Sequence, residues 1–215
     1  MVPFYEDVDY PFFERVLQAR PDVMHFNARG AFFLDLATAG KWVNSTHMEV
    51  LMGYSDRRYG LPLHLNHSMF VAPWFTAHMQ RKDRSFKAAR RKKRVAGDAR
   101  ITKYLTKFGS KWGAEIDTLY APMIWEGMYW VGLRISLSQW NILVLDPNPQ
   151  LKTMEKVEEL VEPVASILSY IAKKMYIKTQ NNTRPVYIVR VQERTQTGGF
   201  RGVFELAQRN NERVR

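Results

Sequence analysis

Three consecutive apolar segments in the middle of the chain place the strongest limit on its fold. They are rich in Val, Ile, Leu, Trp and Tyr, and they are predicted to form successive strands over residues 116–123, 129–137 and 140–145. Ser138 and Gln139 leave only a tight link between the second and the third, which predicts an antiparallel hairpin. The run Asp146-Pro147-Asn148-Pro149 then ends the third strand.

A long amphipathic helix is predicted after these strands, over residues 154–175. Its apolar face is formed by Val157, Leu160, Val161, Val164, Ile167, Leu168 and Ile171. Pro163 is expected to kink this helix or divide it in two, because proline lacks the backbone N–H and clashes with the preceding turn. One more strand is predicted over residues 186–191, and a closing helix over residues 202–210.

The chain before the strands is predicted to be mainly helical. Ser45 or Thr46 can cap a helix over residues 45–54, and Gly60–Asn66 is expected to be a loop. Further helices are predicted over residues 70–80, 85–94 and 102–108, whereas the short apolar run over residues 31–36 is compatible with either a helix or a strand. Helices followed by an antiparallel sheet indicate an α+β domain over residues 31–215, preceded by an arm over residues 1–30 with a helical patch near residues 12–19.

The composition excludes several classes of protein. The 215 residues include no cysteine, so a disulfide scaffold, a Cys-ligated zinc site and a thiol nucleophile are excluded. No apolar run approaches ~18 residues, so no transmembrane helix and no membrane partner are predicted. The first ten residues are acidic and contain proline, unlike a secretory signal, which favours the nucleus or the cytoplasm.

The net charge of +11 is concentrated in one segment. Residues 81–100 hold ten Lys and Arg against Asp83 and Asp98, and the run Arg90-Arg91-Lys92-Lys93-Arg94 is its centre. Three interpretations stay open, namely a solvated helix face, a nuclear localisation signal and a nucleic-acid contact. Phe86 is the only aromatic residue in this segment, so a platform for stacking bases is not predicted.

Two histidines and one serine invite a chemical interpretation that the sequence does not favour. His64 and His67 have a spacing that metal ligands use, but no third ligand lies near them and Pro62 favours a loop there. Ser45 lies close to His47, and a helix cap explains it better than a nucleophile does. No metal site is therefore predicted.

Five short motifs follow one another along the chain in a distinctive order: Trp42-Val43-Asn44, Lys111-Trp112-Gly113, Gly127-Met128-Tyr129-Trp130, Ile142-Leu143-Val144-Leu145-Asp146-Pro147 and Gln196-Thr197-Gly198-Gly199-Phe200-Arg201-Gly202. The series resembles the Ulp1/SENP-type ubiquitin-like protease domain, a family of cysteine peptidases, over roughly residues 31–210. It is most similar to the divergent copies found in plant genomes, many of them associated with transposable elements. The resemblance implies a papain-like α+β fold with a mixed central sheet, no cofactor and a SUMO-type modifier as partner.

The same resemblance implies where a His-Asp-Cys triad would lie. The histidine position, directly before Trp130, is Tyr129, the aspartate is Asp146, and the nucleophile position is Arg201. The glutamine of the oxyanion hole matches Gln196 only if the loop is one residue shorter; otherwise that position is Thr195. The two tryptophans of the family that lie near the modifier's Gly-Gly tail correspond to Trp42 and Trp130.

These replacements remove the chemistry of a cysteine peptidase. Tyrosine titrates near ~10 and is no general base at neutral pH, and arginine has no lone pair with which to attack a carbonyl. We therefore expect a pseudoenzyme, and we expect Arg201 to face solvent or to pair with Asp146 or Glu205. The alternatives left open are an active peptidase, a nuclear or transposon-derived interaction protein that acts through its basic segment, and a decayed gene product.

Overall fold

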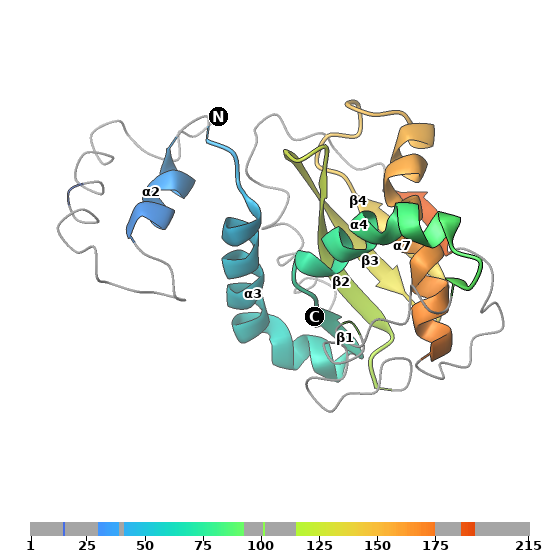
Figure 1. Ribbon diagram of the computed structural model, residues 1–215. Coiled ribbons are helices and arrows are strands. Elements are labelled where there is room, and N and C mark those ends of the chain that lie inside the picture. The colour runs from blue at the N-terminus through green and yellow to red at the C-terminus, as the bar shows by residue number, and fades with distance from the viewer. Residues whose placement is uncertain are drawn as a thin grey trace. The chain divides into compact units, whose positions relative to one another are not determined.

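The computed structural model describes residue 15 and residues 30–38, 41–92, 101, 115–174 and 186–191 (Figure 1). Two compact units make up the chain, Met1–Tyr54 and Ser55–Arg215. The predictions for residues 12–19, 102–108 and 202–210 lie outside the described residues, and the boundary at residue 30 stays a prediction. Among the described residues, no helix combines the length and the apolar character needed to cross a membrane.

Helix α3 (Ser45–Leu65) begins where a helix was predicted but continues through the residues that were predicted to form a loop. Gly60 and Pro62 favoured the loop, yet the buried side chain of Leu63 anchors the last turn to the core. The Asn66 side-chain amide donates to the Pro62 carbonyl oxygen over 2.9 Å and closes the end of the helix. The predicted loop over residues 60–66 is therefore wrong, because tertiary packing outweighs local propensity here.

Asn44, and not Ser45 or Thr46, caps the start of α3. Its Oδ1 accepts hydrogen bonds from the backbone N–H groups of Thr46 and His47, over 2.9 and 3.0 Å. His47 Nδ1 in turn accepts the Asn44 backbone N–H over 3.1 Å. This reciprocal arrangement is a capping box in which histidine takes the place of the usual Glu or Gln. Before it, residues 31–36 lie in a helix, α2 (Gly30–Ala37).

His47 makes the start of α3 sensitive to acid. Burial lowers its pKa, the nearby Asp35 partly opposes this, and Lys41 adds to the lowering. The folded state thus favours the neutral ring, so its stabilising contribution is complete above the unfolded pKa near ~6.5 and is lost as the pH falls below it. We expect the free energy of unfolding in urea to fall more between pH 8 and pH 5 in the wild type than in His47→Gln. An equal loss in both would contradict this.

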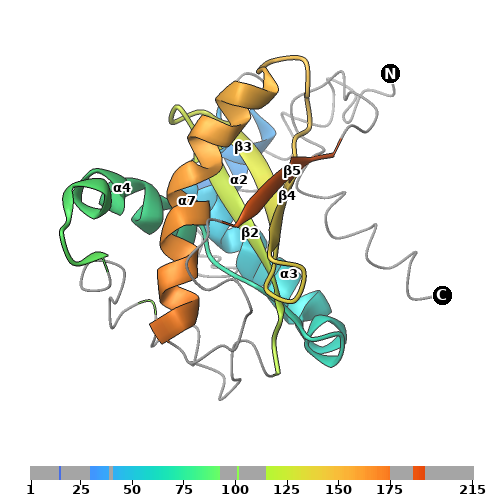
Figure 2. The same ribbon diagram turned by 90° about the vertical axis from the view of Figure 1, so that its right-hand side faces the viewer.

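The sheet has five strands in the order β1-β2-β3-β4-β5; Figure 1 labels β1 to β4, and Figure 2 shows β5 beside β4. The strands are β1 (Ser68–Phe70), β2 (Thr118–Trp125), β3 (Tyr129–Ser136), β4 (Asn141–Leu145) and β5 (Tyr187–Arg190). The β2–β3 and β3–β4 pairs are antiparallel, and the β1–β2 and β4–β5 pairs are parallel. The predicted strands and the predicted hairpin are confirmed, and the sheet is mixed, as the family resemblance implied.

Two helices pack on the apolar side chains of the sheet. α4 (Trp74–Ala88) is one continuous helix where two were predicted, because residues 81–84 contain no helix breaker. Phe70 was predicted to begin the first of these helices, but it belongs to β1 and pairs with β2. α7 (Met154–Lys174) is also continuous, so Pro163 does not divide it. Its predicted apolar face is confirmed: Val157, Val161, Val164, Ile167, Leu168 and Ile171 are buried, and Leu160 is partly buried. Burial on both sides of Pro163 holds the helix together across the missing hydrogen bond.

Side chains of α4 complete the edge of β2 where β1 ends. The β2 carbonyl oxygen of Tyr120 accepts the backbone N–H of Val71 over 2.9 Å. Further along, the Pro122 carbonyl accepts Thr76 Oγ1 over 2.7 Å, and the Ile124 carbonyl accepts Gln80 Nε2 over 3.1 Å. Pro122 is tolerated within the strand because its missing N–H faces this edge, where none of the described strands pairs with it.

Candidate active site

The strand pairing brings two of the predicted site positions to one end of the sheet. Tyr129 is the first residue of β3, and Asp146 directly follows the last residue of β4. Because β3 and β4 are antiparallel, with Gly132 opposite Leu145, the start of one lies beside the end of the other.

Tyr129 and Asp146 are joined by a direct hydrogen bond. The Tyr129 hydroxyl donates to Asp146 Oδ1 over 2.5 Å. The backbone N–H of Asn148 donates to the Tyr129 hydroxyl oxygen over 2.9 Å and to Asp146 Oδ1 over 3.0 Å. The hydrogen bond from Asn148 to Asp146 closes the turn that an aspartate before proline commonly forms. Asp146 thus holds the loop after β4 and the tyrosine at once.

Arg190, on β5, completes this cluster, and the sequence analysis did not identify it. Its Nη2 forms an ion pair with Asp146 Oδ2, and its Nη1 donates to the Lys152 carbonyl oxygen over 2.7 Å. The side chains of Arg190 and Asp146 are only 8% and 1% exposed. Exposure alternates along β5: Tyr187 and Val189 are exposed, whereas Ile188 and Arg190 are partly buried on the other face. This two-residue period of a strand was the only indication that Arg190 faces inward.

The cluster keeps a proton on Tyr129. Burial raises the pKa of the Tyr129 hydroxyl, and the hydrogen bond to the Asp146 carboxylate raises it further. The ring also stacks on the fully buried Trp125, with ring centroids 5.9 Å apart. A hydroxyl held in this way donates a hydrogen bond and accepts no proton from a nucleophile at neutral pH.

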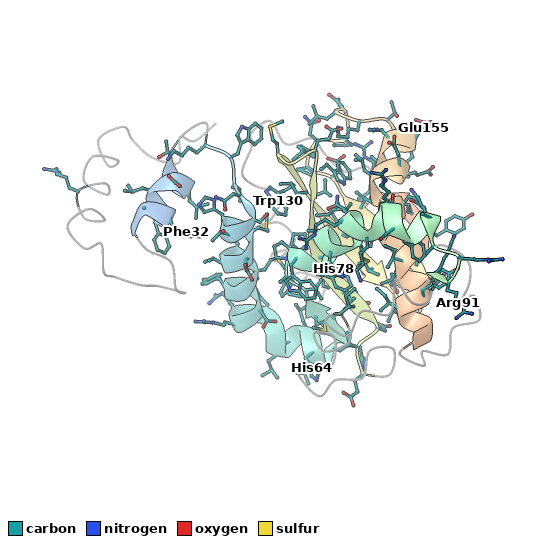
Figure 3. All side chains as sticks on the ribbon, in the orientation of Figure 1. Phe32, His64, His78, Arg91, Trp130 and Glu155 are labelled. Atoms are coloured by element: carbon teal, nitrogen blue, oxygen red, sulfur yellow. The ribbon has the colours of Figure 1, made fainter. Side chains whose placement is uncertain are left out.

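The other predicted site residues separate into two groups. Gln196 and Arg201 lie outside the described residues, so their roles stay predictions. Arg190 already pairs with Asp146, one of the two acidic residues with which Arg201 was expected to pair if it did not face solvent. Trp130 is described, half-buried on β3 opposite Ile124 (Figure 3). Trp42, in the first unit, is 67% exposed.

The two histidines proposed and rejected as metal ligands lie near the end of α3. His67 Nδ1 is 2.8 Å from the Glu115 carbonyl oxygen. Within the part of the chain that the structure describes, no group of three or more His, Cys, Asp and Glu side chains is placed to hold a metal ion.

Comparisons with known proteins identify the fold. Solved structures that share the fold include SUMO protease Ulp1 with its catalytic cysteine oxidised to a sulfinic acid, with a TM-score of 0.61 and 13% identity, covering 96% of this chain and 83% of that one. The Ulp1 protease domain in complex with Smt3, the yeast ortholog of SUMO, has a TM-score of 0.59 and 12% identity, covering 98% and 85%. The Ulp1-like SUMO protease catalytic domain of Chaetomium thermophilum has a TM-score of 0.56 and 13% identity, covering 97% and 78%.

No curated protein matches the sequence. At 12–13% identity, the solved structures establish the fold, an α+β Ulp1 protease fold, and nothing more. The sequence itself matches the Ulp1 protease family, C-terminal catalytic domain, over residues 41–200. That match covers most of the chain, and the chain therefore belongs to the Ulp1 protease family.

Proposed function

We propose that this chain binds a SUMO-type ubiquitin-like modifier and does not cleave it. One observation carries the proposal: the Tyr129 hydroxyl donates to Asp146, the residue that would orient a catalytic histidine, and Arg190 pairs with the other oxygen of the same carboxylate. A carboxylate engaged in this way, beside a tyrosine whose pKa is raised, serves structure and not proton transfer.

The sequence supports the loss of catalysis independently. The chain contains no cysteine at any position, and Arg201 stands where the family has its nucleophile. A thiolate is the attacking group in a cysteine peptidase, and a guanidinium cannot replace it.

Retention of modifier binding is supported by two features. A solved domain with this fold was crystallised in complex with Smt3. In this chain, both tryptophans that the family resemblance assigns to the modifier's tail are present, and 67% of Trp42 is exposed to solvent. Exposed tryptophans contribute strongly to binding when a partner buries them. The nuclear or cytoplasmic location and the plant origin stay predictions.

The experiment uses SUMO with a fluorophore amide-linked to its Gly-Gly tail. Fluorescence anisotropy measures binding, and release of the free fluorophore measures cleavage. We expect binding without release. Release above the rate of the labelled modifier alone would contradict the loss of catalysis, and no binding at high micromolar concentrations by a folded chain would contradict the modifier as partner.

Trp42→Ala tests the assigned tail contact. Because Trp42 is exposed, its removal leaves the core intact, and we expect the dissociation constant for labelled SUMO to rise by about tenfold or more. The matched control is Tyr187→Ala, which removes another aromatic side chain that is 76% exposed, on β5. Equal weakening by both variants would contradict a specific role for Trp42.

A further inference from the structure

Exposed cations gather at the C-terminal end of α4 and in the residues that follow it. Residues 81–92 contain seven Lys and Arg and one acidic residue, Asp83. Six of these cations have exposed side chains, and the five other than Lys87 form what we call the α4 basic surface: Arg81, Arg84, Arg90, Arg91 and Lys92.

Two acidic side chains beside this surface, Asp83 and Glu162, are already paired with Lys87. Lys87 Nζ lies 2.9 Å from Asp83 Oδ2 and 2.7 Å from Glu162 Oε2 on α7. These hydrogen bonds, with Glu162 first and Asp83 second, raise the pKa of Lys87. Within the described residues, the five cations of the α4 basic surface form no ion pair, and Lys92 interacts with Glu162 only at longer range. Most of their charge is therefore available to a partner.

Contacts with the buried Phe86 hold the α4 basic surface in place. Phe86 is buried, and its ring meets Tyr170 of α7 edge to face with centroids 5.1 Å apart. Lys92 Nζ lies 5.3 Å from the centroid of the same Phe86 ring. The chain therefore remains anchored beyond the end of α4, and the cations on either side of that end share one support.

We propose that the α4 basic surface binds the phosphate backbone of double-stranded nucleic acid without reading its sequence. Four of its five cations are arginines, and each planar guanidinium group can donate two parallel hydrogen bonds to the oxygens of one phosphate. The single aromatic residue of the segment, Phe86, is buried and offers no face for a base to stack on, which favours a duplex over a single strand. Arg91 and Trp130, which belong to the same unit, are well separated in Figure 3, so this surface does not include Trp130.

The test measures the anisotropy of a labelled duplex DNA of about 20 base pairs between 50 and 200 mM salt. If all five cations meet phosphates, the logarithm of the binding constant falls with the logarithm of salt concentration with a slope near −4.5. Arg90→Glu with Arg91→Glu is expected to weaken binding at least tenfold and to reduce the slope by about 2. Two unrelated duplex sequences should bind alike.

The matched control reverses two exposed arginines on α3, Arg57→Glu with Arg58→Glu, which lowers the net charge by the same amount. We expect this control to keep most of the affinity. Equal weakening by both double variants would show attraction to net charge alone and overturn the proposal. It would also be overturned by no duplex binding at 50 mM salt, by tighter binding to single-stranded DNA, or by equal binding to polyglutamate. Bound SUMO should leave the duplex affinity unchanged.

Discussion

Replacing Arg190 by methionine is expected to lower the free energy of unfolding by about 3–5 kcal/mol, the cost of leaving a buried charge without its partner. Asp146 keeps a side chain that is 1% exposed, so water cannot replace the lost guanidinium. The Lys152 carbonyl oxygen also loses its donor. Urea denaturation followed by circular dichroism measures the effect.

Two further variants show whether the charge is the cause. Arg190→Met combined with Asp146→Asn should be less destabilised than Arg190→Met alone, because no unpaired carboxylate remains. Lys156→Met removes a cation from an exposed pair with Glu159 at 2.9 Å and should leave stability almost unchanged, because solvent screens such a pair. An Arg190→Met variant within 1 kcal/mol of the wild type would contradict the proposed importance of the buried ion pair.

Trp125→Ala is the second substitution with a large expected effect. Trp125 is fully buried and stacks against the Tyr129 ring, so its truncation leaves a cavity and should cost about 3–5 kcal/mol. The same change at the exposed Trp42 gives a control with identical chemistry, and we expect it to cost less than about 1 kcal/mol. Similar losses in both variants, measured in urea, would contradict the assignment of the core.

Strands were predictable here because their pattern is local. The segments that became β2, β3 and β4 are predominantly apolar, and the residues between them favour turns. The continuation of α3 through Pro62 was not predictable, because it depends on where Leu63 is buried in the folded chain. Local propensity sets only a weak preference against such packing.

In the candidate site too, some residues were predictable from the sequence and one was not. The family motifs identified Tyr129 and Asp146, and the strand order brings them together. Arg190 lies 44 residues beyond Asp146 in the chain, and the motifs include no arginine at that point. Only the parallel pairing of β5 with β4 places it beside the carboxylate, and that pairing depends on contacts distant in sequence.

The hydrogen bonds from α4 to β2 also bear on self-assembly. A strand edge with free carbonyl groups invites a strand from another molecule to extend the sheet, which is how many proteins aggregate and how some capture extended peptides. Thr76 and Gln80 occupy the carbonyl groups of Pro122 and Ile124, and the proline has no N–H to offer. Intermolecular sheet extension is thus blocked along this stretch of β2, without the charged side chains that often guard an edge.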